Sequence, residues 1–127
     1  MTTAFFDGKV VPHLDLPAAL SKIGEASAVR EMLAMLADLL AQDVPKIRQA
    51  LLNQDIALVG RMMHSLKGCM PIFCTATICD QVALVERHAK SGEPSQVQQT
   101  YALLGPALAD LELEIQLYLM NPAETLK

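Results

Sequence analysis

The residues around His64 have the clearest capacity for chemistry in this chain of 127 residues. A neutral imidazole is a competent nucleophile near pH 7, because the ordinary pKa of histidine is about 6.5. A helix turns by about 100° per residue, so Arg61 and Lys67, three residues either side, become neighbours of His64. Gly60 and Gly68 lie four residues either side and complete the patch. An exposed imidazole between two cations could accept an anionic group and compensate its charge.

Two glycines in a helix interior each cost about 1 kcal/mol relative to alanine. We expect Gly60 and Gly68 to allow a large partner close to His64, rather than to serve core packing. The opposite side of the same helix carries an apolar stripe at helical spacing, so His64 should point away from the core. That stripe is expected to consist of Val59, Met62, Leu66 and Cys69.

Helical spacing of apolar residues continues along most of the chain, and no segment alternates at period two for long enough to predict a strand. We expect helices at about 16–23, 27–52, 55–70, 78–90 and 95–120. Asp15 and Asp55 are suited to cap the first and third of them, and Thr75 or Thr77 the fourth. Pro45 should kink or split the second helix, and Pro106 makes an unbroken last helix doubtful.

These elements predict an all-α fold, an antiparallel four-helix bundle with a short additional N-terminal helix. Residues 15–127 would form the bundle. Residues 1–14 lack periodicity and are expected to form an N-terminal arm. Apolar residues make up 52 % of the chain and tryptophan is absent, which is typical of a packed helical bundle.

Composition also argues against several classes of partner. The net charge of −4 disfavours nucleic acid, and no uncharged apolar run of about 18 residues exists to span a membrane. The N-terminus lacks the pattern of a signal peptide, so we expect a cytoplasmic protein. Cys69, Cys74 and Cys79 are spaced by five residues, which would not converge on zinc, so we expect buried free thiols and no metal site. No cofactor is expected either, because a glycine-rich phosphate loop is absent.

The run His64, Leu66, Lys67 and Gly68, in a helical frame covering roughly residues 15–120, resembles the histidine-containing phosphotransfer (HPt) domain of multistep two-component phosphorelays. The resemblance implies that His64 accepts a phosphoryl group on Nε2. It implies that Lys67 stabilises the charge of that group, and that Gly68 leaves room for an incoming receiver domain.

The resemblance further implies a phosphocarrier rather than an enzyme. It would shuttle phosphoryl groups between receiver-domain aspartates, with response-regulator receiver domains and a hybrid sensor histidine kinase as partners. These partners would supply ATP and Mg²⁺. The chain departs from the family in having Cys74 where a glycine is frequent, and Pro71 where small residues are common. An alternative is therefore a non-catalytic docking module that inhibits or scaffolds a kinase or receiver.

A receiver would dock around the histidine. Gly60, Arg61 and Met63 are expected to contribute to that surface, and Ile56 flanks it. Methionine adapts to more than one partner surface. Met63 is equally compatible with the edge of the core.

Four other polar residues need an interpretation. Glu86 either orients the His64 imidazole through Nδ1 or is an ordinary exposed glutamate. Lys90 either faces His64 or is an ordinary cation at a helix end, and the second is slightly favoured. His13 and His88 are expected to be ordinary solvated side chains.

Overall fold

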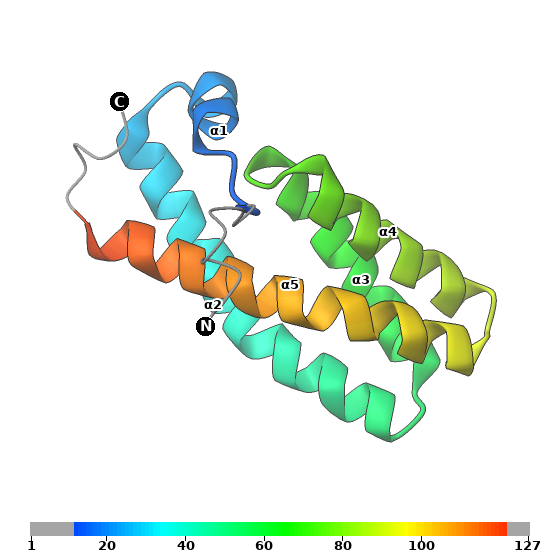
Figure 1. Cartoon of the computed structure of the whole chain (residues 1–127). Helices are drawn as coiled ribbons and strands as arrows, with labels where there is room; N and C mark the ends of the chain where they lie inside the picture. The colour runs from blue at the N-terminus through cyan, green and yellow to red at the C-terminus, as the bar shows by residue number, and fades with distance from the viewer. Residues whose placement is uncertain (1–11, 122–127) are drawn as a thin grey trace, which may run out of the picture.

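The computed structural model describes residues 12–121. Within these residues, five α-helices occupy the segments in which apolar residues recur at helical spacing (Figure 1). The helices are α1 (Leu16–Ile23), α2 (Ala26–Leu52), α3 (Ile56–Cys69), α4 (Ala76–Lys90) and α5 (Pro94–Met120). A 3-10 turn, Met70–Ile72, joins α3 to α4. The predicted all-α class and the short additional N-terminal helix are confirmed.

Two of the predicted helix caps are present. The Asp15 carboxylate accepts a hydrogen bond from the backbone N–H of Ala18, and the Asp55 carboxylate accepts one from Leu58. Each cap satisfies a backbone donor that the first turn of a helix leaves unpaired. Thr75 occupies the N-cap position of α4, but its side chain makes no capping hydrogen bond.

The prolines inside the long helices do not divide them. Pro45 lies within a continuous α2 and Pro106 within a continuous α5, so the split considered at Pro45 does not occur. Proline removes the hydrogen bond to the carbonyl four residues earlier. Pro45 and Ala41 are both exposed, so water can bind the carbonyl that Pro45 leaves free.

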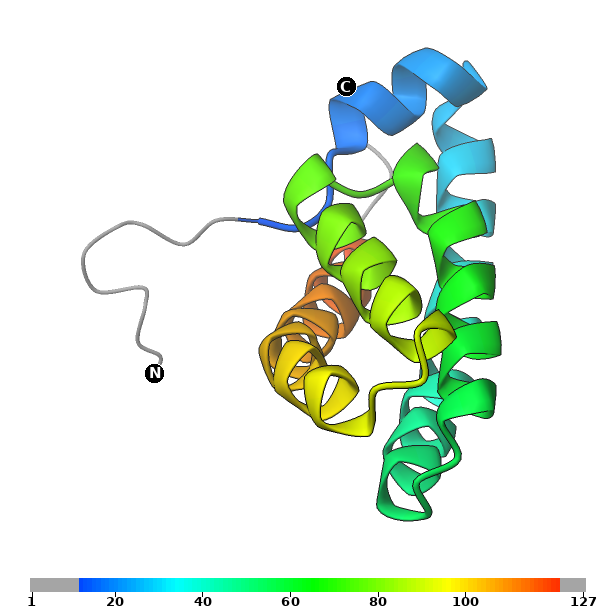
Figure 2. The same cartoon turned by 90° about the vertical axis from the view of Figure 1, so that its right-hand side faces the viewer.

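The four long helices form a bundle in which each packs against two neighbours. α3 lies between α2 and α4, and α5 also lies between α2 and α4. α3 and α5 therefore occupy diagonally opposite corners (Figure 2). The larger fully buried side chains come from all four corners: Leu33, Leu40, Ile47, Met63, Leu66, Ile78, Leu104, Leu108, Leu111 and Ile115.

The described part of the predicted N-terminal arm is tied to the bundle. The backbone N–H groups of His13 and Leu14 donate to the Glu114 carboxylate of α5, at 2.8 and 2.9 Å. Leu14 also forms a β-bridge with Cys74 and is buried in the core. Residues 1–11 of the predicted arm lie outside the described residues, as do residues 122–127.

The cysteines are free thiols, as predicted. Cys74 is buried, and burial raises its pKa to about 12, which keeps it in the thiol form. Cys69 and Cys79 are half-buried. In residues 12–121 no three histidine, cysteine, aspartate or glutamate side chains gather where a metal ion could bind.

Within the described part of the chain, no helix is both long and apolar enough to cross a bilayer.

Candidate functional site

His64 lies on the solvent side of α3. Its side chain is 69 % exposed, whereas Val59, Met63 and Leu66 of the same helix are fully buried. These buried residues recur at spacings of four and three, which is the core-facing stripe of an amphipathic helix. The prediction that His64 points away from the core is confirmed.

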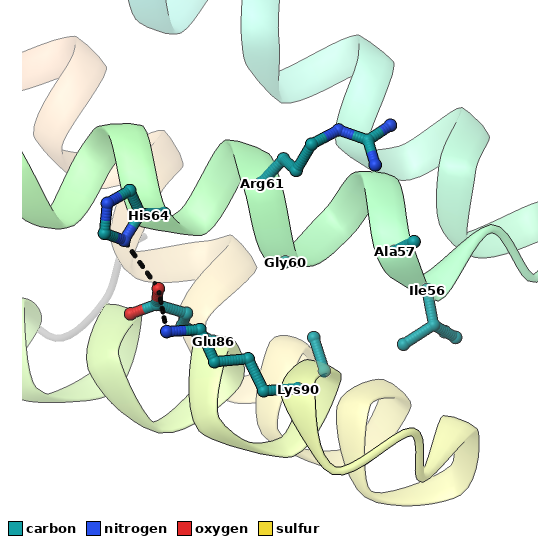
Figure 3. A pocket seen from close by; sticks show the side chains of 8 residues that line it. Ile56, Ala57, Gly60, Arg61, His64, Glu86 and Lys90 are labelled. Atoms are coloured by element: carbon teal, nitrogen blue, oxygen red, sulfur yellow. Dashed lines mark hydrogen bonds and ion pairs between the residues drawn. The ribbon is translucent and has the colours of Figure 1, made fainter.

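The side chain of Glu86, on α4, contacts the imidazole ring of His64. Its Oε2 atom lies 2.8 Å from His64 Nδ1 (Figure 3), and its side chain is only 2 % exposed. Of the two interpretations of Glu86, the structure supports the one in which its carboxylate orients the imidazole through Nδ1. A buried carboxylate is costly unless it is paired and hydrogen-bonded, so this residue is held there by its partners.

Two lysines complete the surroundings of that carboxylate. Lys67 Nζ lies 2.7 Å from Oε1 of Glu86, and Lys90 Nζ lies 3.2 Å from Oε2. Lys90 therefore faces the His64 site and is not merely a helix-end cation. The hydrogen bond from Lys67 is the main cause that lowers the pKa of Glu86 to about 2, with His64 and Lys90 acting in the same direction against burial, which raises it.

The ionised state of Glu86 decides which nitrogen of His64 is free. A carboxylate without a proton can only accept hydrogen bonds, so Nδ1 of His64 must be the donor. In a neutral imidazole the other nitrogen, Nε2, then carries a lone pair and no proton. The exposed nitrogen of His64 is thus presented as a nucleophile.

A groove of about 690 Å³ opens beside this ring, between α3 and α4. Its floor is apolar and its rim carries the polar site residues. The lining residues are Ile56, Ala57, Gly60, Arg61, His64, Glu86, Ala89 and Lys90 (Figure 3). Ala57 and Ala89 were missed by the sequence analysis; the position of Ala89, three residues after Glu86 on one face of α4, is the pattern that could have indicated it.

The two glycines that flank His64 have different surroundings. A Cβ atom added at Gly60 would lie 3.2 Å from the Cβ of Ala89, so Gly60 allows α3 to approach α4 closely. The expectation that core packing plays no part in this glycine was therefore wrong. A Cβ atom added at Gly68 would meet nothing within 4 Å, so Gly68 leaves open space on the face of α3 that carries His64.

This difference predicts different effects on stability for two alanine substitutions. Gly68→Ala should raise the free energy of unfolding by about 0.5–1 kcal/mol, because alanine is the better helix former and the site is open. Gly60→Ala should bring no such gain, because the new methyl group presses on Ala89. Urea unfolding followed by circular dichroism measures both. Equal stabilisation by the two substitutions would contradict this assignment of Gly60.

Two further residues predicted for the docking surface are placed differently. Met63 is fully buried in the core, so its predicted contribution to a docking surface was wrong. Arg61 is exposed and lines the groove, but its guanidinium points away from His64 in Figure 3. In this conformation the lysines, and not Arg61, lie nearest to the histidine–carboxylate pair.

The other two histidines of the chain lie away from this site. His13 is half-buried, with Nε2 3.8 Å from the Asp110 carboxylate of α5. His88 is half-buried with Nδ1 3.4 Å from the Thr100 hydroxyl. The prediction that both are ordinary solvated side chains was therefore wrong, because each packs against α5.

The ion pairs of Glu86 predict a specific pH dependence of stability. The pKa of Glu86 is about 2 in the folded chain, against an ordinary value of 4.5. Between pH 4.5 and pH 2, Glu86 binds a proton in the unfolded chain but not in the folded chain. The free energy of unfolding therefore falls as the pH falls through this range. We expect the difference in unfolding free energy between wild type and Glu86→Gln to shrink between pH 4.5 and pH 2. Urea titrations at several pH values measure it, and a difference that stays constant would contradict the role of Glu86 as an ion-paired carboxylate.

Comparisons with known proteins bear on the same helices. A search of curated proteins and a search of solved structures gave no significant match. The family model described as "Hpt domain" matches residues 31–118. This range contains α3 and α4, which carry the histidine, the glutamate and both lysines of the site. Because the matched range covers more than half of the chain, this protein belongs to the family of Hpt domains, whose function is histidine phosphotransfer in phosphorelays.

Proposed function

We propose that this chain accepts a phosphoryl group on Nε2 of His64 and passes it on, as a shuttle between the aspartates of receiver domains. The observation that carries the proposal is the 2.8 Å contact between His64 Nδ1 and the buried carboxylate of Glu86. That contact fixes the tautomer and the orientation of the ring before any partner arrives. His64 is the catalytic residue in this proposal, and Glu86 is a positioning residue.

The transfer needs no proton to leave the histidine. The lone pair of Nε2 forms a bond to phosphorus while the bond between phosphorus and the aspartyl oxygen breaks, which returns the aspartate as a carboxylate. The Nδ1 proton stays in place, and the imidazole gains positive charge. Glu86, at hydrogen-bond distance, stabilises that charge, so the acceptor requires no separate general base.

The phosphoryl oxygens need cations, because charge compensation is the main requirement of this loose transition state. Lys67 and Lys90 both lie within ion-pair distance of Glu86, the carboxylate that also contacts the His64 ring. Lys67 is the cation assigned to the phosphoryl group. Arg61, which lines the same groove, can reach it only by rotating its side chain from the present position.

Partners would supply the rest of the machinery. Hpt domains act together with receiver domains and kinases in phosphorelays. The proposal assigns ATP to an upstream hybrid sensor kinase and Mg²⁺ to the receiver domains, with no cofactor of the chain's own. The open face at Gly68 and the groove at Gly60 would receive the partner.

Transfer from a phosphorylated receiver domain tests the proposal directly. Trypsin cleaves after Arg61 and after Lys67, which releases Met62–Lys67 as a peptide with His64 as its one histidine. His88 leaves in a different peptide, between Arg87 and Lys90. We expect the phosphoryl mass on Met62–Lys67, lost in acid and retained in base.

Each alternative gives a distinct result. Phosphoryl mass that survives acid on this peptide would indicate Ser65 and would contradict the assignment to His64. Tight binding of a receiver or kinase without any transfer would overturn the shuttle and favour the docking module that inhibits or scaffolds its partner.

A further inference from the structure

The three donors around Glu86 are divided unequally between its two oxygen atoms. Oε1 is paired with Lys67, whose Nζ lies at 2.7 Å. Oε2 has two partners, His64 Nδ1 at 2.8 Å and Lys90 Nζ at 3.2 Å. If Lys67 moved away, Oε1 would lose its partner among residues 12–121. Departure of Lys90 would instead leave one donor on each oxygen of the carboxylate.

Lys90 is therefore the lysine that Glu86 can lose at the smaller cost. A buried charged acceptor without any hydrogen bond is costlier than one that loses one of two partners. Lys90 lies four residues after Glu86 on α4, and its side chain is 67 % exposed, against 44 % for Lys67. Pairs at this spacing on a helix surface stabilise the helix only weakly, and water solvates an exposed ammonium group that moves away.

The charges of the site are unbalanced before any transfer takes place. Two ammonium groups face one carboxylate, and the imidazole of His64 is neutral while Nε2 carries its lone pair. The free site therefore has one positive charge in excess. A phosphoryl group on Nε2 brings negative charge on its three outer oxygens, which favours a second cation beside the ring.

We propose that Lys90 is a second phosphoryl-binding cation, which turns from Oε2 of Glu86 to the phosphoryl group on His64. This inference rests on the proposed function of His64. Lys90 Nζ and His64 Nδ1 contact the same oxygen atom, so they are separated by at most two contact lengths. Lys90 also lines the groove that opens beside the ring (Figure 3). Rotation about the bonds of its flexible four-carbon stem carries the ammonium group toward Nε2 without a shift of α4.

Lys67 keeps its contact with Oε1 of Glu86 while the histidine is loaded. An ammonium group has three N–H donors, so Lys67 contacts the phosphoryl group with one donor while another stays on Oε1. Oε2 keeps its hydrogen bond from His64 Nδ1. Both oxygens of the buried carboxylate remain paired, and the orientation of the ring is preserved.

Urea unfolding of the free chain tests the unequal division of donors. Lys67→Met should lower the free energy of unfolding more than Lys90→Met does, because only Lys67→Met leaves Oε1 unpaired. Arg87→Met is the matched control and should unfold like the wild type. Arg87 is an exposed cation in the same last turn of α4, and the contacts of Glu86 given above do not include it. Equal losses in Lys67→Met and Lys90→Met would overturn the proposal.

Chemical loading with phosphoramidate tests the role of Lys90 without any partner protein. Nε2 of His64 forms a bond to phosphorus while the phosphorus–nitrogen bond of the donor breaks and ammonia leaves. The initial rate, measured on the peptide Met62–Lys67, should be about tenfold lower in Lys90→Met, the factor expected for one charge-assisted hydrogen bond. Lys90→Arg should keep most of the wild-type rate because it keeps a charged donor, and Arg87→Met should keep all of it. Equal rates in the wild type and Lys90→Met would overturn the proposal.

Nitrogen-15 NMR of the lysine ammonium groups follows the movement itself. The Nζ resonance of Lys90 should shift when phosphoramidate loads the chain, whereas that of Lys46, an exposed lysine of α2, should not. A Lys90 resonance that is unchanged by loading would overturn the proposal. If phosphoramidate loads His64 and no receiver domain does, the shuttle fails, and these rates and resonances still decide the role of Lys90. A His64 that takes no phosphoryl group from either donor would overturn both proposals.

Discussion

The variant His64→Gln is expected to accept no phosphoryl group from any receiver domain that labels the wild type. The lone pair of an amide nitrogen is delocalised, so glutamine offers no nucleophile at the position of Nε2. The amide can still meet the Glu86 carboxylate, which keeps that group hydrogen-bonded. The side chain of His64 is mostly exposed, so unfolding free energy should change by less than about 0.5 kcal/mol. Initial rates of label transfer from a phosphorylated receiver measure the effect.

His88→Gln is the matched control for this experiment. His88 lies on α4, is half-buried against Thr100 of α5, and does not line the groove beside His64. Its replacement should leave transfer at the wild-type rate. Labelling of His64→Gln that matches the wild type would show that another residue accepts the phosphoryl group.

Glu86→Leu is expected to slow transfer to His64 by about ten- to a hundredfold. A hydrogen bond to a charged group contributes about 1.5–3 kcal/mol, and each 1.4 kcal/mol changes a rate tenfold. Leucine removes the acceptor of Nδ1, so the ring can rotate and either tautomer can form. Glu86→Gln should fall between leucine and wild type, because its amide oxygen still accepts the Nδ1 hydrogen bond but carries no charge.

A comparison of glutamine with leucine separates this positioning role from a structural one. Both substitutions remove the ion pairs of Glu86, so both should lower the free energy of unfolding at neutral pH. His64, Lys67 and Lys90 are exposed enough to regain water, which limits that loss. Glutamine alone keeps an acceptor for Nδ1, so its folded chains should transfer faster than those of Glu86→Leu. Equal transfer rates for glutamate, glutamine and leucine would show that Glu86 does not position the ring.

The helical spacing of residues predicted the exposed face of α3 correctly, but it placed Met62 in the core in place of Met63. Met62 and Met63 are adjacent, and a stripe at alternating steps of three and four can include either. Met63 is completely buried and Met62 only in part. The packing of α2 and α4 against α3 determines which row of α3 side chains is covered. That choice depends on the crossing of helices, which one helix alone does not encode.

The sequence left the role of Glu86 open between orienting His64 and ordinary exposure, for a related reason. A glutamate on a helix is exposed in most proteins, and Glu86 gives no local sign that it is 2 % exposed. The close approach of α3 and α4 at Gly60 and Ala89 brings it beneath His64. The sequence of α3 alone indicated the nucleophile, whereas the choice between the two roles of Glu86 depends on how α4 packs against α3.

Three groups donate to the one carboxylate of Glu86: Nδ1 of His64 and the ammonium groups of Lys67 and Lys90. This sharing affects the direction in which phosphoryl groups are transferred. One ammonium group can turn toward a phosphoryl group while the carboxylate keeps two of its hydrogen bonds. The change from free to loaded histidine then requires rotation of a lysine side chain and no displacement of a helix. A receiver that delivers phosphate and a receiver that removes it would meet the same backbone surface. Such a site is suited to reversible exchange, in which the relative stability of the two phosphorylated partners, rather than a conformational change in the carrier, sets the direction of flow.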